Sequence, residues 1–392
     1  MRRAELLQGV RKMRFQEAYA GWQASRLTQE EAARLLGVHE RTFRRYIDRY
    51  EEEGFEGLAD KRLEQVSHRR APTDEVLRLE ALYRERYQGW NVKHFHSFYR
   101  RRHGGGRSYT WVKNRLQVAG LVQRASGKGK HRKRRERAPL AGMMVHQDGS
   151  THQWVAGVYW DLIVTMDDAT SEHYSMFFTE EEGTASSFRG VRETLDAHGL
   201  FCSLYTDRGS HYWHTPEAGG KVDKRCLTQF GRAMSHLGIE MIAAYSPEAR
   251  GRSERAFGTH QGRLPRELAA EGITTIEAAN RYLDDVYRAA FNAEFARPAA
   301  EQGSAFVPLM GVQIDEILCE RFERTVGRDN CVAFEGRNLQ IPPSGQRMHY
   351  VKVKVRVHRY TDGSLAVFHG PRKLAEYGAE PGEDQPIIKA VA

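Results

Sequence analysis

The hydrophobic pattern changes near residue 141, and this change restricts the fold more than any other feature of the sequence. Beyond it, three runs typical of strands come first, and helical and strand-like runs then alternate. Three strands followed by alternating helices and strands predict an α/β sandwich with a mixed sheet. The expected strands lie at 144–150, 158–166, 174–178, 201–206 and 239–245, and the expected helices at 184–198, 223–237, 248–272 (interrupted near Pro265) and 273–295.

Positive charge is concentrated before this point. Residues 1–140 carry a net charge of +16 and residues 141–392 one of −7, which together give +9. Such a basic segment favours a nucleic-acid partner over a membrane, because no amphipathic anchor or lipidation signal accompanies it. No apolar run approaches the ~20 residues that span a bilayer. The N-terminus has no secretory signal, and four scattered cysteines suit a reducing cytoplasm, so we expect a cytoplasmic protein.

Residues 28–50 have the pattern of a helix-turn-helix. Thr28 and Glu31 form a capping box that starts a first helix, and Gly37 suits the left-handed residue that ends it. Phe43 and Ile47 would face inward from a second helix, which leaves basic side chains outside. Such a helix can lie in a major groove, although a helical hairpin with a solvated basic face is the alternative. The predicted DNA contacts are Arg41, Thr42, Arg44, Arg45 and Arg49.

A second helical unit is expected after a linker at 57–73. Its helices would cover 74–87 and 92–102, and Ser108 or Thr110 would open a third. We interpret the unit as another helix-turn-helix, with Lys113 and Asn114 as DNA contacts. Its expected core is Trp111, Val112, Leu116 and Val118, and its histidines His94, His96 and His103 are interpreted as core or surface residues rather than metal ligands.

Residues 126–138 form a basic run without large apolar side chains, which cannot build a packed core. Such runs are often solvated linkers, but between DNA-binding units and an acidic domain this one favours contact with phosphates. The candidate contacts are Lys128, Lys130, Arg132, Lys133, Arg134 and Arg135.

Three carboxylates stand out by their position in the expected sheet. Asp148 lies inside the first strand, and Asp207 ends the fourth, where α/β sheets place their ligands. Glu254 lies near the start of a late helix. If the first and fourth strands are adjacent and that helix packs across their ends, the three acids converge. Clustered acids without a basic partner favour divalent cations, here two Mg²⁺ or Mn²⁺ ions.

Other acids have simpler explanations. Glu248 is the main rival of Glu254, because an acid near a helix start often serves as an N-terminal charge. The remaining acids are Asp167 and Asp168 in a turn, Asp161 as a polar residue of an edge strand, and Glu180, Glu181 and Glu182 in a solvated run.

Three segments of the chain resemble the integrase core of DDE transposases. They are Asp148-Gly149-Ser150, the run from Tyr205 to Ser210 and the run from Ser246 to Arg255. Residues 254–268 and 291–298 resemble insertion-sequence transposases of the ISNCY group. The resemblance covers about residues 20–370, and it departs from the family at Ser253 and His260, where apolar residues are common.

This resemblance implies a ribonuclease-H-like fold, as in retroviral integrases, with Asp148, Asp207 and Glu254 as catalytic residues that hold two Mg²⁺ or Mn²⁺ ions. It also implies a bacterial, nucleoid-associated protein and a small β-barrel after the core. Residues 351–359 alternate apolar and basic side chains, 361–364 suit a hairpin turn and 365–368 a return strand. The basic face of this segment would either bind phosphates or protect a sheet edge.

We therefore expect a multidomain α/β protein with a DDE transposase function. It would bind terminal inverted repeats in double-stranded DNA, cleave by two-metal hydrolysis and join 3′-hydroxyl ends to target DNA as a homo-oligomer, at least a dimer. Arg250 and Arg255 would steady DNA phosphates. A non-catalytic DNA-binding regulator and a structure-selective nuclease are the alternatives. The expected domains are helix-turn-helix units at 1–60 and 61–125, a basic linker at 126–140, the catalytic core at 141–300, a β-barrel at 301–375 and a disordered tail at 376–392.

Overall fold

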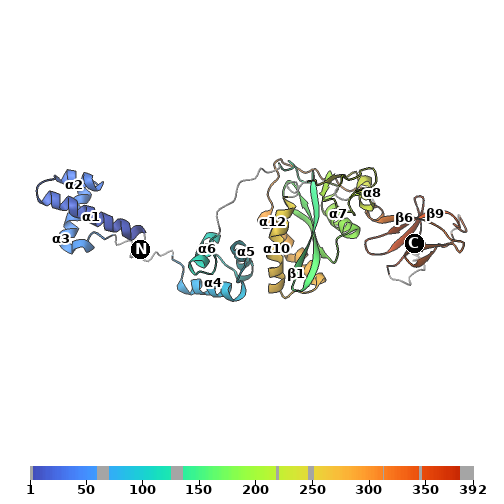
Figure 1. The fold of residues 1–392 in the computed structure, drawn as a ribbon, viewed down its shortest axis with the longest axis horizontal. Helices are drawn as coiled ribbons and strands as arrows, with labels where there is room; N and C mark the ends of the chain where they lie inside the picture. Colours follow the sequence, from blue (N-terminus) through green and yellow to red (C-terminus); the bar gives the residue numbers. More distant parts are fainter. Residues whose placement is uncertain are drawn as a thin grey trace. The chain divides into compact units, whose positions relative to one another are not determined.

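The computed structural model describes residues 3–59, 70–124, 136–217, 220–245, 251–311, 313–343 and 347–379. The chain divides into two compact units. One comprises Met1–Gln88 with Val118–Leu121, and the other comprises Gly89–Gln117 with Val122–Ala392. Figure 1 labels the principal helices and strands of both.

The first unit is helical and contains the predicted helix-turn-helix. Thr28 Oγ1 accepts a hydrogen bond from Glu31 N at 3.2 Å, and Thr28 N donates to Glu31 Oε2 at 2.8 Å, which confirms the capping box. Gly37 ends the helix with φ +67°, as expected for a left-handed cap. The helices are α1 (Arg3–Gln23), α2 (Gln29–Leu36), α3 (Glu40–Glu53), the 3₁₀ turn η1 (Gly54–Glu56) and α4 (Thr73–Arg86).

The core of this unit includes a helix that the sequence did not predict. Phe43 and Ile47 are buried as expected, and they pack with Phe15 and Ala18 of α1. Charged residues are spread around α1, so its apolar positions do not form a clear stripe. Its place depends on tertiary packing rather than on a local signal.

The second unit begins with α5 (Val92–His103) and α6 (Tyr109–Val118), both close to the predicted ranges. Val112 and Leu116 are buried as predicted. Trp111 is only half-buried and Val118 is 81% exposed, so their assignment to the core was wrong. Val118 is the last residue of its helix, where a side chain can extend past the packed surface.

The central sheet has five strands in the order β3-β2-β1-β4-β5. The first three strands pair antiparallel, and β4 and β5 continue the sheet parallel to β1. This is the predicted mixed sheet, with the first and fourth strands adjacent as the ribonuclease-H-like resemblance implies. The strands are β1 (Val145–Val155), β2 (Val158–Asp167), β3 (His173–Thr179), β4 (Ser203–Thr206) and β5 (Glu240–Ala243).

Helices cover both faces of the sheet, with α10 and α12 on one side and α7 on the other (Figure 1). Each side has its own core: Phe188 and Phe230 belong to one, and Leu162 and Leu264 to the other. The helices are α7 (Thr184–His198), α8 (Gln229–His236), α10 (Ser253–Ala270), α11 (Ile276–Tyr282), the π-helical segment η3 (Leu283–Tyr287), α12 (Arg288–Phe295) and α13 (Ile314–Ile317).

Two helix predictions need correction. The helix expected from residue 223 begins only at Gln229, because Thr228 caps it by accepting a hydrogen bond from Gly231 N at 3.0 Å. The helix α10 continues through Pro265 without the expected interruption. Proline removes one backbone donor, and the burial of Leu264 and Leu268 on either side of Pro265 compensates for that loss.

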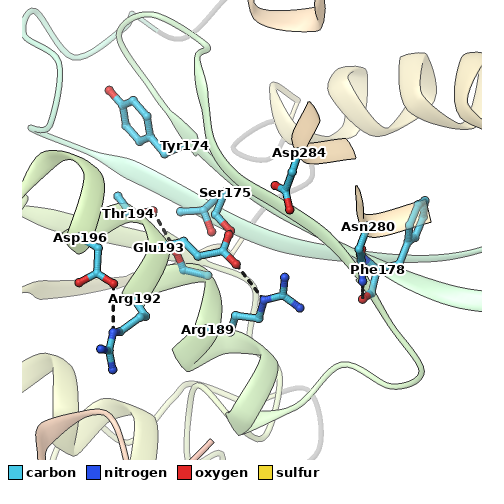
Figure 2. A network of polar contacts seen from close by, with 12 residues as sticks. Tyr174, Ser175, Phe178, Arg189, Arg192, Glu193, Thr194, Asp196, Asn280 and Asp284 are labelled. Atoms are coloured by element: carbon cyan, nitrogen blue, oxygen red, sulfur yellow. Dashed lines mark hydrogen bonds and ion pairs between the residues drawn. The ribbon is translucent and has the colours of Figure 1, made fainter. Parts of the chain in front are cut away.

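Polar contacts fix the flanking helices against the edge strand β3. Ser175 Oγ donates to Glu193 Oε2 of α7 at 2.6 Å, and Arg189 Nε donates to Glu193 Oε1 at 2.8 Å (Figure 2). Asn280 of α11 accepts from Phe178 N at 2.6 Å and donates to Phe178 O at 3.0 Å. These bonds set the distance of both helices from the sheet.

The C-terminal segment forms an open four-stranded sheet in the order β11-β10-β9-β6 and a separate β7-β8 hairpin. Its described strands therefore do not close into the expected barrel, because β7 and β8 share the core of the sheet without hydrogen-bonding to it. The predicted turn is present, with Tyr360 N donating to Ser364 O at 3.0 Å. The strands are β6 (Glu320–Thr325), β7 (Cys331–Phe334), β8 (Arg337–Gln340), β9 (Lys354–Arg359), β10 (Leu365–His369) and β11 (Arg372–Tyr377).

Two further expectations for this segment change. Val355 and Val357 are buried as predicted, but His358 on the opposite face of β9 is buried as well, so that face is not basic and solvated throughout. Strand β11 runs to the buried Tyr377, so the disordered tail was predicted to begin too early. Separately, no helix in the described parts of the chain combines the length and apolar character that a membrane span needs.

Candidate active site

Asp148 and Asp207 are brought together by the pairing of two parallel strands. His146 and Tyr205 are register partners on β1 and β4, and their ring centroids lie 5.0 Å apart. Asp148 and Asp207 each follow two residues later, so they continue the same register on the same face. Neighbouring strands lie about 5 Å apart. The two carboxylates therefore occupy adjacent positions where β4 ends.

The environment of Tyr212 indicates that a third acid lies near this pair. Its hydroxyl donates to Gln147 Oε1 at 3.0 Å. Burial, and then the negative charges of Glu182, Asp148 and Asp207, hold the pKa of the Tyr212 phenol well above its usual value. Glu182 was interpreted as part of a solvated run, but here it is half-buried and its charge acts on Tyr212. A run of three glutamates carries no signal that distinguishes one member from the others.

The start of α10 is anchored beside β1 by a buried ion-pair network. Asp168 Oδ1 lies 2.7 Å from His146 Nε2 and also contacts Arg252 at the start of α10. Asp168 Oδ2 accepts from Ala138 N at 2.7 Å. Burial alone would raise the pKa of Asp168, but the bonds from His146 and Ala138 and the charge of Arg252 outweigh it and hold that pKa well below its usual value.

A second contact fixes the middle of the same helix. Gln261 Nε2 of α10 donates to Ser150 Oγ at 3.0 Å, and Ser150 shares a strand face with Asp148. Glu254 precedes Gln261 by two helical turns and so lies on the same side of α10. The two anchors, at His146 and at Ser150, thus lie on either side of Asp148 along β1.

Glu254 itself is exposed. Among the residues that the structure describes, no three His, Cys, Asp or Glu side chains are grouped so that they could hold a metal ion. The pairing of β1 with β4 thus brings the segments of Asp148 and Asp207 side by side, and Glu254 lies on the helix that packs against β1. Residues 246–250, with the rival Glu248 and the predicted DNA contact Arg250, lie outside the described residues.

The structure locates three of the acids that were given simpler explanations. The turn assigned to Asp167 and Asp168 is present, with Asp167 Oδ2 accepting from Thr170 N at 2.8 Å. Asp161 was expected on an edge strand, but β2 lies between β3 and β1, so that interpretation was wrong. Its Oδ2 accepts from Glu182 N at 2.7 Å and fixes the backbone of that residue.

His260 belongs to a buried hydrogen-bonded chain behind the site. His260 Nε2 lies 3.0 Å from His173 Nε2, His173 Nδ1 lies 3.2 Å from Ser171 O, and His260 Nδ1 lies 3.1 Å from the Tyr287 hydroxyl. All four ring nitrogens are satisfied when both rings are neutral and His260 donates to His173. Burial lowers the pKa of His173 to about 4 and holds the pKa of His260 well below its usual value.

The histidines of α5 have structural roles. His94 Nε2 lies 2.7 Å from Glu267 Oε1 of α10, and Glu267 Oε2 also accepts from Arg101 and Tyr282. His96 Nε2 lies 2.9 Å from the carbonyl oxygen of Arg107. The network at Glu267 fastens α5 to the helix that carries Glu254.

The predicted DNA contacts of the described helices lie mainly at the surface. On α3, the four arginines are exposed and Thr42 is half-buried. On α6, Asn114 is exposed and Lys113 is half-buried. On α10, Arg255 is exposed and donates to Gly251 O at 2.7 Å. The contacts predicted in the basic linker, Lys128, Lys130, Arg132, Lys133, Arg134 and Arg135, lie outside the described residues.

Comparison with known proteins shows what the chain is similar to. Residues 22–63 match a helix-turn-helix domain. The chain is 29% identical over 348 residues to the protein named putative transposase y4bF of Sinorhizobium fredii, covering 87% of this chain and 75% of the relative. It is 28% identical over 232 residues to the transposase for insertion sequence IS1202 of Streptococcus pneumoniae, covering 59% of this chain and half of the relative. The chain is similar to transposases. This similarity confirms the expected resemblance to transposases.

Solved structures give weaker matches. A chain of the simian T-cell lymphotropic virus intasome is 13% identical with a TM-score of 0.34, covering 76% of this chain and 95% of that one. The HTLV-2 integrase catalytic core domain in complex with magnesium is 15% identical with a TM-score of 0.29, covering 38% of this chain and 87% of that one. Scores this low do not establish a common fold.

Proposed function

We propose that this chain is a DDE transposase that binds the terminal inverted repeats of an insertion sequence, cleaves DNA and joins 3′-hydroxyl ends to target DNA. The observation that supports the proposal is the parallel pairing of β1 with β4, in which His146 is the partner of Tyr205 and the aspartates follow two residues later in each segment. The similarity of the chain to transposases supports the same reaction.

The donor set of the site fits hard divalent cations. Asp148 and Asp207 present carboxylate oxygens, which Mg²⁺ and Mn²⁺ prefer. When bound, two such ions activate an attacking oxygen and stabilise the leaving oxygen of a phosphodiester. Asp148 is nearly buried, so its negative charge is screened little by solvent and favours a cation strongly.

Glu254 is proposed as the third acid of this site. Its place on α10 between the anchors at Arg252 and Gln261 supports the assignment, because those anchors hold the helix beside the face of β1 that carries Asp148. We propose that the first turn of α10 shifts on DNA binding and brings Glu254 to the two aspartates. Arg250 and Arg255, which flank Glu254 in the sequence, would contact phosphates there.

DNA binding is assigned to the helix-turn-helix of α2 and α3, to α6 and to the basic linker. Joining two element ends requires at least two copies of the chain on DNA, so we propose a homo-oligomer. The domain limits expected at residues 60, 125, 140 and 300 remain part of this proposal, as does a bacterial, nucleoid-associated location.

A strand-transfer assay tests the function. Purified protein is incubated with Mg²⁺, labelled DNA ending in the flanking repeats of its own gene and a supercoiled target. Wild type should yield joined products, and Asp148→Asn and Asp207→Asn should each lower their yield by at least about 100-fold, because the paired acids act as a unit. Full joining by Asp148→Asn would refute the assignment.

The same assay separates the alternatives. Cleaved but never joined DNA would indicate a structure-selective nuclease of the same fold. Specific binding without cleavage, unaffected by Mg²⁺ and by Asp148→Asn, would indicate a DNA-binding regulator.

A further inference from the structure

Gly149 and Gly209 are the residues next in sequence to Asp148 and two after Asp207. At both positions a larger residue would collide with neighbouring side chains, whereas the backbone conformation itself does not require glycine. Neither Gly149 nor Gly209 has a φ in the left-handed region. A Cβ on Gly149 would lie 2.1 Å from Glu182 Oε2 and 2.5 Å from Glu182 Cδ. The Glu182 carboxylate therefore covers Gly149 on the face of β1 opposite to the one that carries Asp148.

Gly209 marks a similar place beside Asp207. A Cβ on Gly209 would lie 3.0 Å from Asp207 Oδ1 and 3.2 Å from His211 Nδ1. The carboxylate of Asp207 and the Nδ1 edge of the His211 ring therefore face the same point. Gly209 N donates to Asp207 Oδ1 at 2.9 Å, which fixes that carboxylate relative to the loop.

Glu182 and His211 lie close to each other. His211 Nε2 lies 3.6 Å from Glu182 Oε1, and this buried nitrogen has no hydrogen-bond partner among the described residues. The His211 ring packs on Tyr212 with centroids 4.0 Å apart, and Glu182 N is held by Asp161. Only a small rotation of the Glu182 side chain is needed to bring the 3.6 Å contact to hydrogen-bonding distance.

A carboxylate facing one imidazole nitrogen selects the tautomer with hydrogen on that nitrogen. Glu182 thus places the hydrogen of His211 on Nε2 and leaves Nδ1 as an acceptor beside Asp207. This acceptor lies close to Gly209 and to the Asp207 carboxylate, just beyond the end of β4.

We propose that His211 is a further catalytic residue of the strand-transfer reaction, with Glu182 as its positioning residue. Nδ1 of His211 accepts a hydrogen bond from the hydroxyl that attacks phosphorus, water during cleavage and the 3′-hydroxyl during joining. His211 orients this oxygen for attack. The proton that the attacking hydroxyl loses passes to solvent water, and the leaving oxygen takes a proton from water. The inference rests on the proposed function, and it adds a histidine and a fourth acid to it.

Isosteric substitutions test which nitrogen acts. The amide oxygen of Asn can occupy the position of Nδ1, whereas the amide of Gln reaches the position of Nε2. In single-turnover joining with Mg²⁺, His211→Ala and His211→Gln should each be about 10- to 100-fold slower, the range typical when a supporting group is removed from such a site. His211→Asn should recover most of the rate, and none of these variants should change the dissociation constant for terminal DNA by more than about twofold.

Control variants at neighbouring residues and the reference variant Asp148→Asn distinguish failure of the role of His211 from failure of the proposed function. His214→Ala and Glu181→Gln change exposed neighbours and should leave the rate unchanged. If Asp148→Asn is inactive while His211→Ala joins at the wild-type rate, the role of His211 is overturned and the proposed function stands. If Asp148→Asn keeps full activity, the proposed function fails. Equal rates for the Gln and Asn variants would overturn the assignment to Nδ1.

A second measurement needs no activity. Gly149→Ala should lower the melting temperature of the full chain, because its Cβ meets the Glu182 carboxylate. Adding Glu182→Ala should restore part of that loss, since it removes the group in the way. If the decrease in melting temperature of the double variant equals the sum of the decreases of the two single variants, Glu182 does not lie over Gly149. That result would overturn the inference.

Discussion

At the scale of single residues, the site depends on polar groups that the sequence does not reveal as partners. The places of Asp148 within β1 and of Asp207 just after β4 could be predicted, because a strand position and a strand end are visible in the pattern. The contacts of Asp168 with His146 and Arg252 could not, because they join residues on separate elements that lie far apart in the chain. Glu182 was missed for a different reason: three consecutive glutamates look alike until a fold selects the one that faces inward.

The buried pair His173 and His260 predicts a loss of stability in mild acid. The folded-state pKa of each lies below its unfolded value near 6.5, so the unfolded chain binds more protons and stability falls as pH drops from about 6.5 towards 4. For His173 alone, with a pKa of about 4, the loss approaches about 3 kcal/mol.

Urea unfolding between pH 7.5 and 4.5 measures this effect. His260→Leu should make the dependence on pH shallower, because one of the two neutral rings is gone, while His236→Leu at an exposed site should not. A wild-type free energy of unfolding that is constant across this range would contradict the prediction.

At the scale of helices and strands, the sequence predicted an element well where nearby residues specify both of its ends or its whole pattern. The capping box at Thr28 and the glycine at 37 fixed both ends of α2, and the alternating pattern located β9. Signals failed where tertiary packing decides, as at Pro265 inside α10 and in the sheet at the C-terminus that does not close. The length of a strand can be predicted from neighbouring residues in the sequence, but the strand with which it forms hydrogen bonds is determined by the tertiary fold.

The attachment of α5 to α10 depends on Glu267. Its carboxylate is buried and is shared by His94, Arg101 and Tyr282. Glu267→Ala leaves buried polar groups without their acceptor, so it should lower the free energy of unfolding by about 3–5 kcal/mol. Glu271→Ala removes a more exposed partner of Arg102 and should cost at most about 1 kcal/mol. Equal losses in urea unfolding would show that the buried network does not hold the helices together.

At the scale of the whole molecule, the uneven charge was the most informative property of the sequence. It predicted a nucleic-acid partner for the first 140 residues and an acidic site beyond them, and the described helices place most of the predicted basic contacts at the surface. Neither the division into compact units nor the order of the central strands follows from charge. Those features depend on packing between distant segments.

Salt dependence of DNA binding tests this distribution of charge. Each phosphate that is no longer neutralised by the protein should reduce the slope of log K against log salt by about 0.9 for duplex DNA. The double variant Arg45→Ala, Arg49→Ala should therefore lower the slope by about 2, while Arg34→Ala, on the preceding helix and paired with Glu30, should change it much less. An unchanged slope in the double variant would remove α3 from the DNA interface.

The most direct test of the proposed cation site is to measure the binding of Mn²⁺ to the full chain. The electron paramagnetic resonance signal of the free ion reports how much Mn²⁺ is bound. We propose that Asp148 and Asp207 form one cation site, so the wild-type protein should bind Mn²⁺. Asp148→Asn and Asp207→Asn should each weaken that binding at least tenfold, as expected when a ligand is removed. Both variants should unfold at the wild-type temperature or above it, because removing one of two neighbouring negative charges relieves repulsion. Equal Mn²⁺ affinity in wild type and both variants would contradict the account.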